Sequence, residues 1–110
     1  SNTVPILENK NILPLKKKTF EDGALIFFEI ASEKVTLKHR NGSRKVDISF
    51  PNQEFFLIWT KPEGDYICLE PCCGIGDIVG SDYNFSNKKG IQKLNKAEEF
   101  NAVHTIKFSE

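Results

Sequence analysis

Residues 34–50, KVTLKHRNGSRKVDISF, decide the fold class. Apolar and polar residues alternate on both sides of Asn41-Gly42, a pattern typical of strands with one buried face. Asn-Gly between two such runs is the strongest short-range hairpin signal, because both residues tolerate positive φ. The sequence therefore predicts an antiparallel hairpin with strands at 34–40 and 44–50.

Further short runs of β-forming residues lie on both sides of this hairpin. Residues 55–59, FFLIW, are apolar at every position, which indicates a central strand covered on both faces. The other predicted strands are 24–30, 66–70, 90–94 and 98–108. Turn residues cluster over 71–89, where we expect a long loop. About seven short strands without a helical period predict an all-β, antiparallel β-sandwich with little or no helix.

Size and composition suit a single domain. Of the 110 residues, 39% are hydrophobic and 27% charged, enough for one core. We expect 1–19 to form an arm or irregular edge and 20–110 to form the β-sheet region. The chain has no methionine and opens with Ser1-Asn2, which is typical of a processed or tagged start. We therefore expect it to be a fragment, over residues 1–110, of a longer domain.

Charge and hydropathy exclude several classes of partner. The 15 basic and 15 acidic residues cancel, so no overall field attracts nucleic acid or an anionic membrane. No apolar run reaches the roughly 20 residues of a membrane span, and the N-terminus lacks a signal pattern. We expect a cytoplasmic protein with a small-molecule partner, and neither nucleic acid nor a membrane as partner.

The three cysteines do not form a recognisable framework. Two of them, Cys72 and Cys73, are adjacent, and this spacing suits neither a disulfide scaffold nor a zinc site. We expect reduced thiols and no metal site.

The run 66–70 ends in a carboxylate, next to a glycine-containing loop. Alternation places Tyr66, Cys68 and Glu70 on one face of the strand. Desolvation raises the pKa of a carboxyl group toward the range that suits a general base. Two interpretations stay open here: a base at the rim of a pocket, or a glutamate that leaves the sheet into solvent.

A series of short motifs extends through most of the chain. They are Ile58-Trp59-Thr60-Lys61-Pro62, Tyr66-Ile67-Cys68-Leu69-Glu70-Pro71, Gly74-Ile75-Gly76-Asp77, Lys88-Lys89-Gly90-Ile91, Glu98-Glu99-Phe100 and Thr105-Ile106, with Leu13-Pro14-Leu15 and residues 20–27 (FEDGALIF) upstream. In order and spacing the chain resembles the C-terminal part of a galactose mutarotase-like protein of the aldose 1-epimerase family.

This resemblance implies a β-supersandwich, a sugar-binding cleft, and exchange of the α and β anomers of a free aldose such as a hexose, without a cofactor. In the family, a glutamate in the motif matching Leu69-Glu70-Pro71 takes the proton from the anomeric hydroxyl, so Glu70 inherits the role of general base. A histidine protonates the ring oxygen. An aspartate in the segment matching Asp22-Gly23-Ala24-Leu25 commonly holds sugar hydroxyls, which makes Asp22 a candidate substrate-binding residue.

The chain also departs from the family. Neither histidine lies in a matching motif: we expect His39 to be exposed or partly packed at the hairpin, and His104 to be packed or at an edge. Relatives carry aromatic residues where this chain has Cys72-Cys73. The alternative is therefore a non-catalytic carbohydrate-binding or structural β-sandwich fragment, and we expect the 110-residue chain alone to be inactive. Unpaired strands also predict self-association through uncovered sheet edges.

Overall fold

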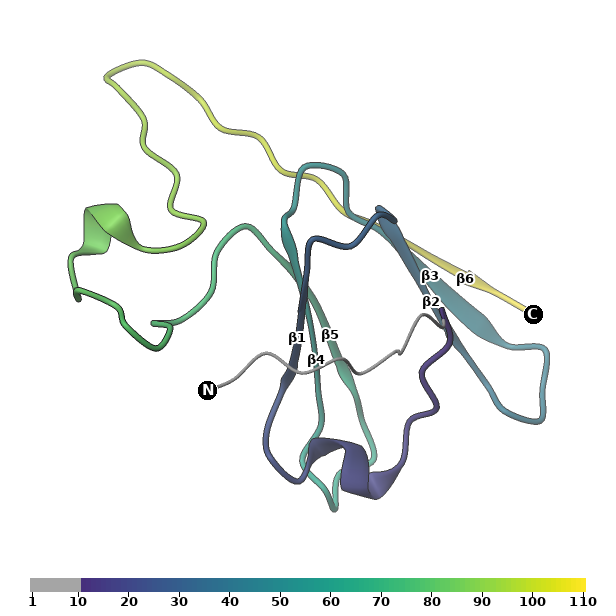
Figure 1. Ribbon diagram of the computed structural model, residues 1–110. Helices are drawn as coiled ribbons and strands as arrows, with labels where there is room; N and C mark the ends of the chain where they lie inside the picture. Colours follow the sequence, from purple (N-terminus) through teal and green to yellow (C-terminus); the bar gives the residue numbers. More distant parts are fainter. Residues whose placement is uncertain (1–10) are drawn as a thin grey trace.

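Two three-stranded antiparallel sheets carry the fold (Figure 1). The computed structural model describes residues 11–110. The first sheet has the order β1-β4-β5 and the second sheet the order β2-β3-β6. The strands are β1 (Leu25–Phe28), β2 (Lys34–Lys38), β3 (Lys45–Ser49), β4 (Phe55–Trp59), β5 (Cys68–Cys72) and β6 (Thr105–Ser109). The helical content of the described residues is two short 3-10 turns, η1 (Lys17–Phe20) and η2 (Phe85–Asn87). The predicted all-β class is thus confirmed.

The predicted hairpin joins β2 to β3, but neither Asn41 nor Gly42 has a positive φ, so its turn does not use the conformation on which the prediction rested. In its register Val35 lies opposite Ile48, and the His39 N–H donates to the Arg44 carbonyl at 3.1 Å. Each strand is shorter than predicted: residues 39, 40 and 44 lie outside the ladder next to the turn, and Phe50 lies outside it at the other end of β3. On the other side of β3, β6 completes the second sheet.

The apolar run at 55–59 forms the central strand of the first sheet, as predicted. β4 lies between β1 and β5, and Phe55, Phe56 and Ile58 are buried. Burial on both faces explains why this strand carries no polar side chain.

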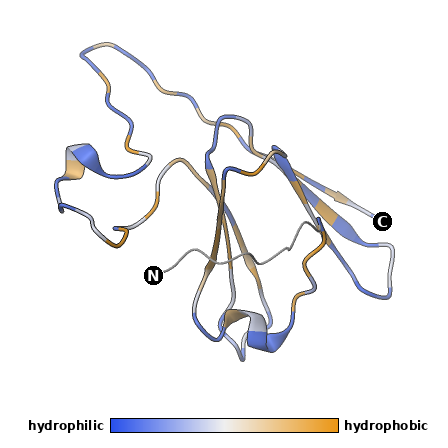
Figure 2. Ribbon diagram, viewed as in Figure 1, coloured by the Kyte–Doolittle hydropathy of each residue, from blue (hydrophilic) through white to orange (hydrophobic). Residues whose placement is uncertain are grey.

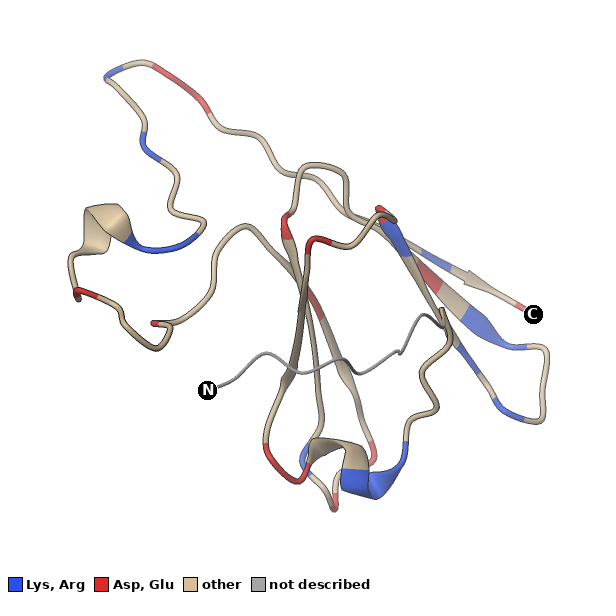
Figure 3. Cartoon of the chain, viewed as in Figure 1, with Lys and Arg blue, Asp and Glu red and all other residues tan. Residues whose placement is uncertain are grey.

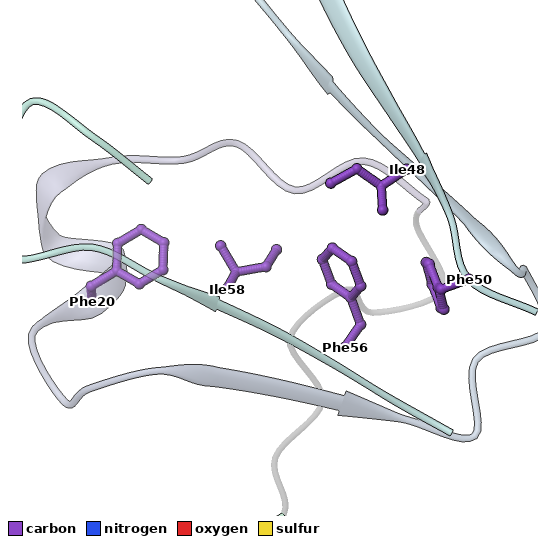
Figure 4. Close-up of a cluster of buried hydrophobic side chains, with 5 residues drawn as sticks. All are labelled: Phe20, Ile48, Phe50, Phe56 and Ile58. Atoms are coloured by element: carbon purple, nitrogen blue, oxygen red, sulfur yellow. The ribbon is translucent and has the colours of Figure 1, made fainter. Parts of the chain in front are cut away.

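The core lies between the two sheets. Its buried side chains are Phe20, Ile48, Phe50, Phe56 and Ile58 (Figure 4). The rings of Phe50, which directly follows β3, and Phe56 of β4 lie 4.9 Å apart and link the two sheets. Figure 2 shows apolar colour along the strands of the first sheet. Because the core contains side chains from β3 and β4, the two sheets form a sandwich-like arrangement.

The connection from β5 to β6 is long and irregular. The strand predicted at 90–94 does not form, and of 98–108 only 105–108 belongs to β6. Leu94 and Phe100 are exposed, because this part of the chain has no neighbouring strand among the described residues, and a strand needs a partner to be stable. The radius of gyration is 15.9 Å, against about 13 Å for a compact domain of this length. Much of the connection extends beyond the sheets (Figure 1), and residues 92–104 are exposed, while the part around Lys89 contacts the first sheet.

The N-terminal region is described from residue 11 onward. Residues 1–10 of the expected arm lie outside the described residues, 11–16 have no regular structure, and Phe20 at the end of η1 enters the core. None of the helices within residues 11–110 is long and apolar enough for a membrane span.

Candidate functional site

Glu70 lies in the middle of β5, opposite Leu57 of β4. The prediction that the strand ends at this glutamate is wrong, because pairing with β4 continues through Cys72, which lies opposite Phe55. The Glu70 side chain is exposed. Of the two interpretations left open, the structure gives the exposed one, so burial does not desolvate this carboxylate.

The carboxylate points away from the core. Leu69 packs against the core cluster, and alternation along β5 places Glu70 on the opposite face. We call this face, turned away from the second sheet, the outer face of the first sheet. A single row across this face consists of Ile26, Leu57 and Glu70, so a charged group ends an otherwise apolar row.

Cys68 and Cys72 are the neighbours of Glu70 on this face along the strand, and Cys72 lies on the side of the groove. Its Sγ donates to the Glu70 carbonyl at 3.5 Å. Burial raises the pKa of the Cys72 thiol above its ordinary value, and the negative charge of Glu70 raises it further. The thiol is therefore protonated near neutral pH and unsuited to act as a nucleophile.

Two aromatic side chains lie next to this row. Trp59 of β4 is opposite Cys68, one row away from Glu70, and its ring is 6.2 Å from that of Tyr66 in an edge-on arrangement. The Thr60 hydroxyl donates to the Tyr66 carbonyl and fixes the start of β5. The sequence placed Tyr66 on the face of Glu70, but it gave no signal for Trp59, because the β4–β5 register decides which residues become neighbours.

The connection after β5 folds over the other end of the outer face and leaves an open groove of about 530 Å³. Its lining residues are Leu57, Cys73, Gly74, Ile75, Gly76, Phe85, Lys88, Lys89, Gly90, Ile91 and Gln92. The Lys89 ammonium lies 4.6 Å from the Phe28 ring centroid and 5.8 Å from that of Phe55. A favourable cation–π contact thus holds the loop against the sheet.

The structure separates the two predicted site residues. Glu70 is next to the groove, since its partner Leu57 lines it, although Glu70 itself does not. Asp22 is exposed in the turn before β1, at the end of the first sheet where Trp59 and Cys68 lie and opposite to the groove end (Figure 1). The predicted roles of both residues stay predictions.

Neither histidine belongs to the first sheet. His39 is exposed in the β2–β3 hairpin, where its Nδ1 accepts from the Asn41 N–H at 3.2 Å. His104 is exposed and directly precedes the edge strand β6. It therefore has the edge environment and not the packed one that its apolar stripe suggested.

Residues 11–110 contain no group of three or more His, Cys, Asp or Glu side chains that could hold a metal ion. Comparison of the chain with protein-family models, curated proteins and solved structures found no match.

Proposed function

We propose that this chain carries the general base, Glu70, of an aldose 1-epimerase-like site that acts on the anomeric centre of a free aldose. The observation that carries the proposal is the Leu69-Glu70-Pro71 motif, whose carboxylate is exposed on the outer face, next to a groove. The groove volume of about 530 Å³ lies within the range of roughly 300–1,000 Å³ for small-molecule sites.

The chemistry follows from the resemblance. The Glu70 carboxylate takes the proton of the anomeric hydroxyl, while an acid donates a proton to the ring oxygen as the bond between this oxygen and the anomeric carbon breaks. The open-chain aldehyde rotates and recloses with either configuration. An exposed carboxylate is accessible to such a substrate, and the Trp59–Tyr66 pair, on the side of Glu70 away from the groove, offers an apolar surface on which a sugar ring can pack.

The absence of a histidine on the first sheet favours the second candidate, a carbohydrate-binding module without catalysis. Within residues 11–110, both His39 and His104 flank strands of the second sheet. Loss of one proton-transfer partner typically slows a reaction by about 10²- to 10⁴-fold. Without added acid, we expect this chain to exchange anomers slowly.

The test supplies the missing acid from solution. α-D-Glucose and α-D-galactose are dissolved with the protein, with and without imidazole, and the anomer ratio is followed by proton NMR. Imidazole alone gives the background rate. We expect the protein to add to this rate, and Glu70→Gln to remove the added part, whereas Glu63→Gln, an exposed acid in the β4–β5 turn, retains it.

Sugar binding is measured alongside by titration calorimetry. Binding without any Glu70-dependent exchange supports the binding module and overturns the catalytic proposal. If Glu70→Gln leaves the added rate unchanged, Glu70 is not the base. If the protein neither binds these sugars nor adds to the rate, the carbohydrate assignment itself is wrong.

A further inference from the structure

The last strand of the second sheet has a free edge. Within residues 11–110, β6 pairs with β3 on one side and with no strand on the other. Beyond that ladder, no backbone hydrogen bond involves β6 among residues 11–110. An exposed edge of this kind presents unpaired N–H and C=O groups that can pair with another strand.

The two faces of this edge strand differ in chemistry. Ile106 and Phe108 lie opposite Ile48 and Val46 and so share their core-facing side. The first sheet does not cover β6, and Ile106 is 49% and Phe108 77% exposed. On the far edge, Val35 of β2 packs against the core. Of the two edge strands of the second sheet, β2 and β6, it is β6 whose apolar side chains are left uncovered.

The opposite face of the second sheet is basic. It carries Lys34 and Lys38 from β2, Lys45 from β3 and Lys107 from β6 (Figure 3). Lys38 lies directly opposite Lys45, an arrangement that destabilises a sheet. The ion pair formed within residues 11–110 joins Arg44 to Glu110, so none of these four lysines is paired with a carboxylate there.

One acidic side chain, Asp47, lies among these lysines. It is opposite both Thr36 and Lys107, and the Thr36 hydroxyl donates to its carboxylate. One carboxylate cannot neutralise four ammonium groups. The face is therefore left with positive charge that a negatively charged partner would offset.

We propose that the free edge of β6 binds an extended segment of a partner protein in which acidic and apolar residues alternate. The backbone of this segment pairs with β6 as an added strand. Its apolar side chains cover Ile106 and Phe108, and its carboxylates lie beside Lys107 on the basic face. Strand addition of this type takes its affinity from the backbone and its specificity from alternate side chains.

A second copy of this chain fits the edge less well. The antiparallel register that pairs all 5 residues of two β6 strands sets Lys107 opposite Lys107, and like charges in that position destabilise the pairing. A nucleic acid would contact the lysines but would leave the apolar face of β6 uncovered. The acidic-apolar strand is the occupant that satisfies both faces.

The experiment measures binding of labelled synthetic peptides by fluorescence anisotropy at about 0.15 M salt, where the screening length is about 8 Å. The probe is a peptide in which glutamate alternates with valine. Its controls are a peptide of the same composition with the glutamates and valines in separate blocks, and an alternating lysine-valine peptide. We expect only the alternating glutamate-valine peptide to bind, and to protect the β6 amides from hydrogen exchange.

Variants locate the contact. Lys107→Glu should weaken binding by about threefold to tenfold and Phe108→Ser by about tenfold, whereas Lys34→Glu, on the same face at the far edge, should change it less than about twofold. Both Lys107 and Phe108 are exposed, so circular dichroism should show the native fold.

Three results would overturn the proposal. The first is equal binding of the block peptide, or equal effects of Lys107→Glu and Lys34→Glu. The second is binding of a single-stranded oligonucleotide that Phe108→Ser leaves unchanged. The third is protection of the β6 amides in the protein alone together with a dimer by light scattering, which would assign the edge to a second copy.

Discussion

Leu57 of β4 lies directly opposite Glu70 of β5, and the same leucine lines the groove beneath the connection that follows β5. Sheet register therefore connects the candidate base to the candidate binding space. Ile26 completes this row, so Glu70 carries its only charge. That charge raises the pKa of Cys72, its neighbour two residues along β5.

The first prediction concerns the effect of that charge on Cys72. Because the carboxylate of Glu70 contributes to the raised pKa of the Cys72 thiol, Glu70→Gln should lower this pKa and increase the thiolate fraction at a given pH. We expect faster alkylation of Cys72 by iodoacetamide at about pH 8, near the ordinary thiol range, followed by peptide mass spectrometry. Glu63→Gln is the control, and an unchanged or slower rate in Glu70→Gln would contradict the predicted coupling.

The second prediction tests the aromatic wall and rests on the proposed function. Tyr66 is 51% exposed, so Tyr66→Ala should leave the fold intact and remove a surface on which a sugar ring can pack. An aromatic contact is worth about 0.5–1.5 kcal/mol, and we expect glucose or galactose affinity to fall by about twofold to tenfold in titration calorimetry. Tyr83→Ala, 83% exposed in the long connection, should retain affinity. Equal losses in the two variants would show that Tyr66 makes no specific contact.

A third prediction compares two glycines of the long connection. Gly90 has φ +81, and a Cβ there would clash with the Cys73 carbonyl oxygen and lie 2.9 Å from the Phe55 ring. Gly80 has a similar φ of +86 but nothing within 4 Å. Gly80→Ala should therefore cost only the left-handed strain of about 1–2 kcal/mol. Gly90→Ala should cost about 1–3 kcal/mol more from overpacking.

Urea unfolding gives the free energy of unfolding of both variants, which is compared with that of the wild type. If the two substitutions lower the free energy of unfolding equally, the loop does not pack on Phe55 in solution.

The fourth prediction concerns acid stability. The hydrogen bond from Thr36 lowers the pKa of Asp47 below its ordinary value of 3.8, and Lys34, Lys45 and Lys107 lower it further. A carboxyl group whose pKa is depressed by folding stabilises the native state above its unfolded pKa, and this contribution is lost as the pH falls through the lowered value. The urea concentration at the unfolding midpoint should therefore decrease as the pH is lowered below about 4. Thr36→Val should reduce this decrease.

Asp82 provides the comparison for this experiment, since its pKa is also lowered, in this case by the Asn87 side chain first and the Asn84 backbone next. Asn87→Ala should alter the acid dependence without affecting the second sheet. An acid profile that Thr36→Val does not change would show that Asp47 is not linked to stability through Thr36.

Local pattern predicted much of the fold. Alternation on both sides of Asn41-Gly42 was enough to locate the β2–β3 hairpin, although these two residues do not adopt the expected positive φ. The uninterrupted apolar run at 55–59 was enough for the central strand. The prediction failed where strand pattern occurs without a partner: 90–94 and most of 98–108 remain irregular, since β-structure depends on pairing between distant segments. For the candidate site, the pattern placed Glu70 on a strand but put the end of that strand at Glu70, whereas pairing with β4 continues to Cys72.

The sequence by itself determined the all-β class, the main turn, the apolar faces and the motif around Glu70, because each of these depends on residues close together along the chain. Tertiary structure alone decided that Glu70 lies opposite Leu57 beside a groove, that Trp59 and Tyr66 come together, and that Asp22 lies at the other end of the sheet. These relationships depend on cross-strand register and on how the long connection folds back over the sheet. Both are set by packing between residues far apart in the chain, which a local pattern does not encode.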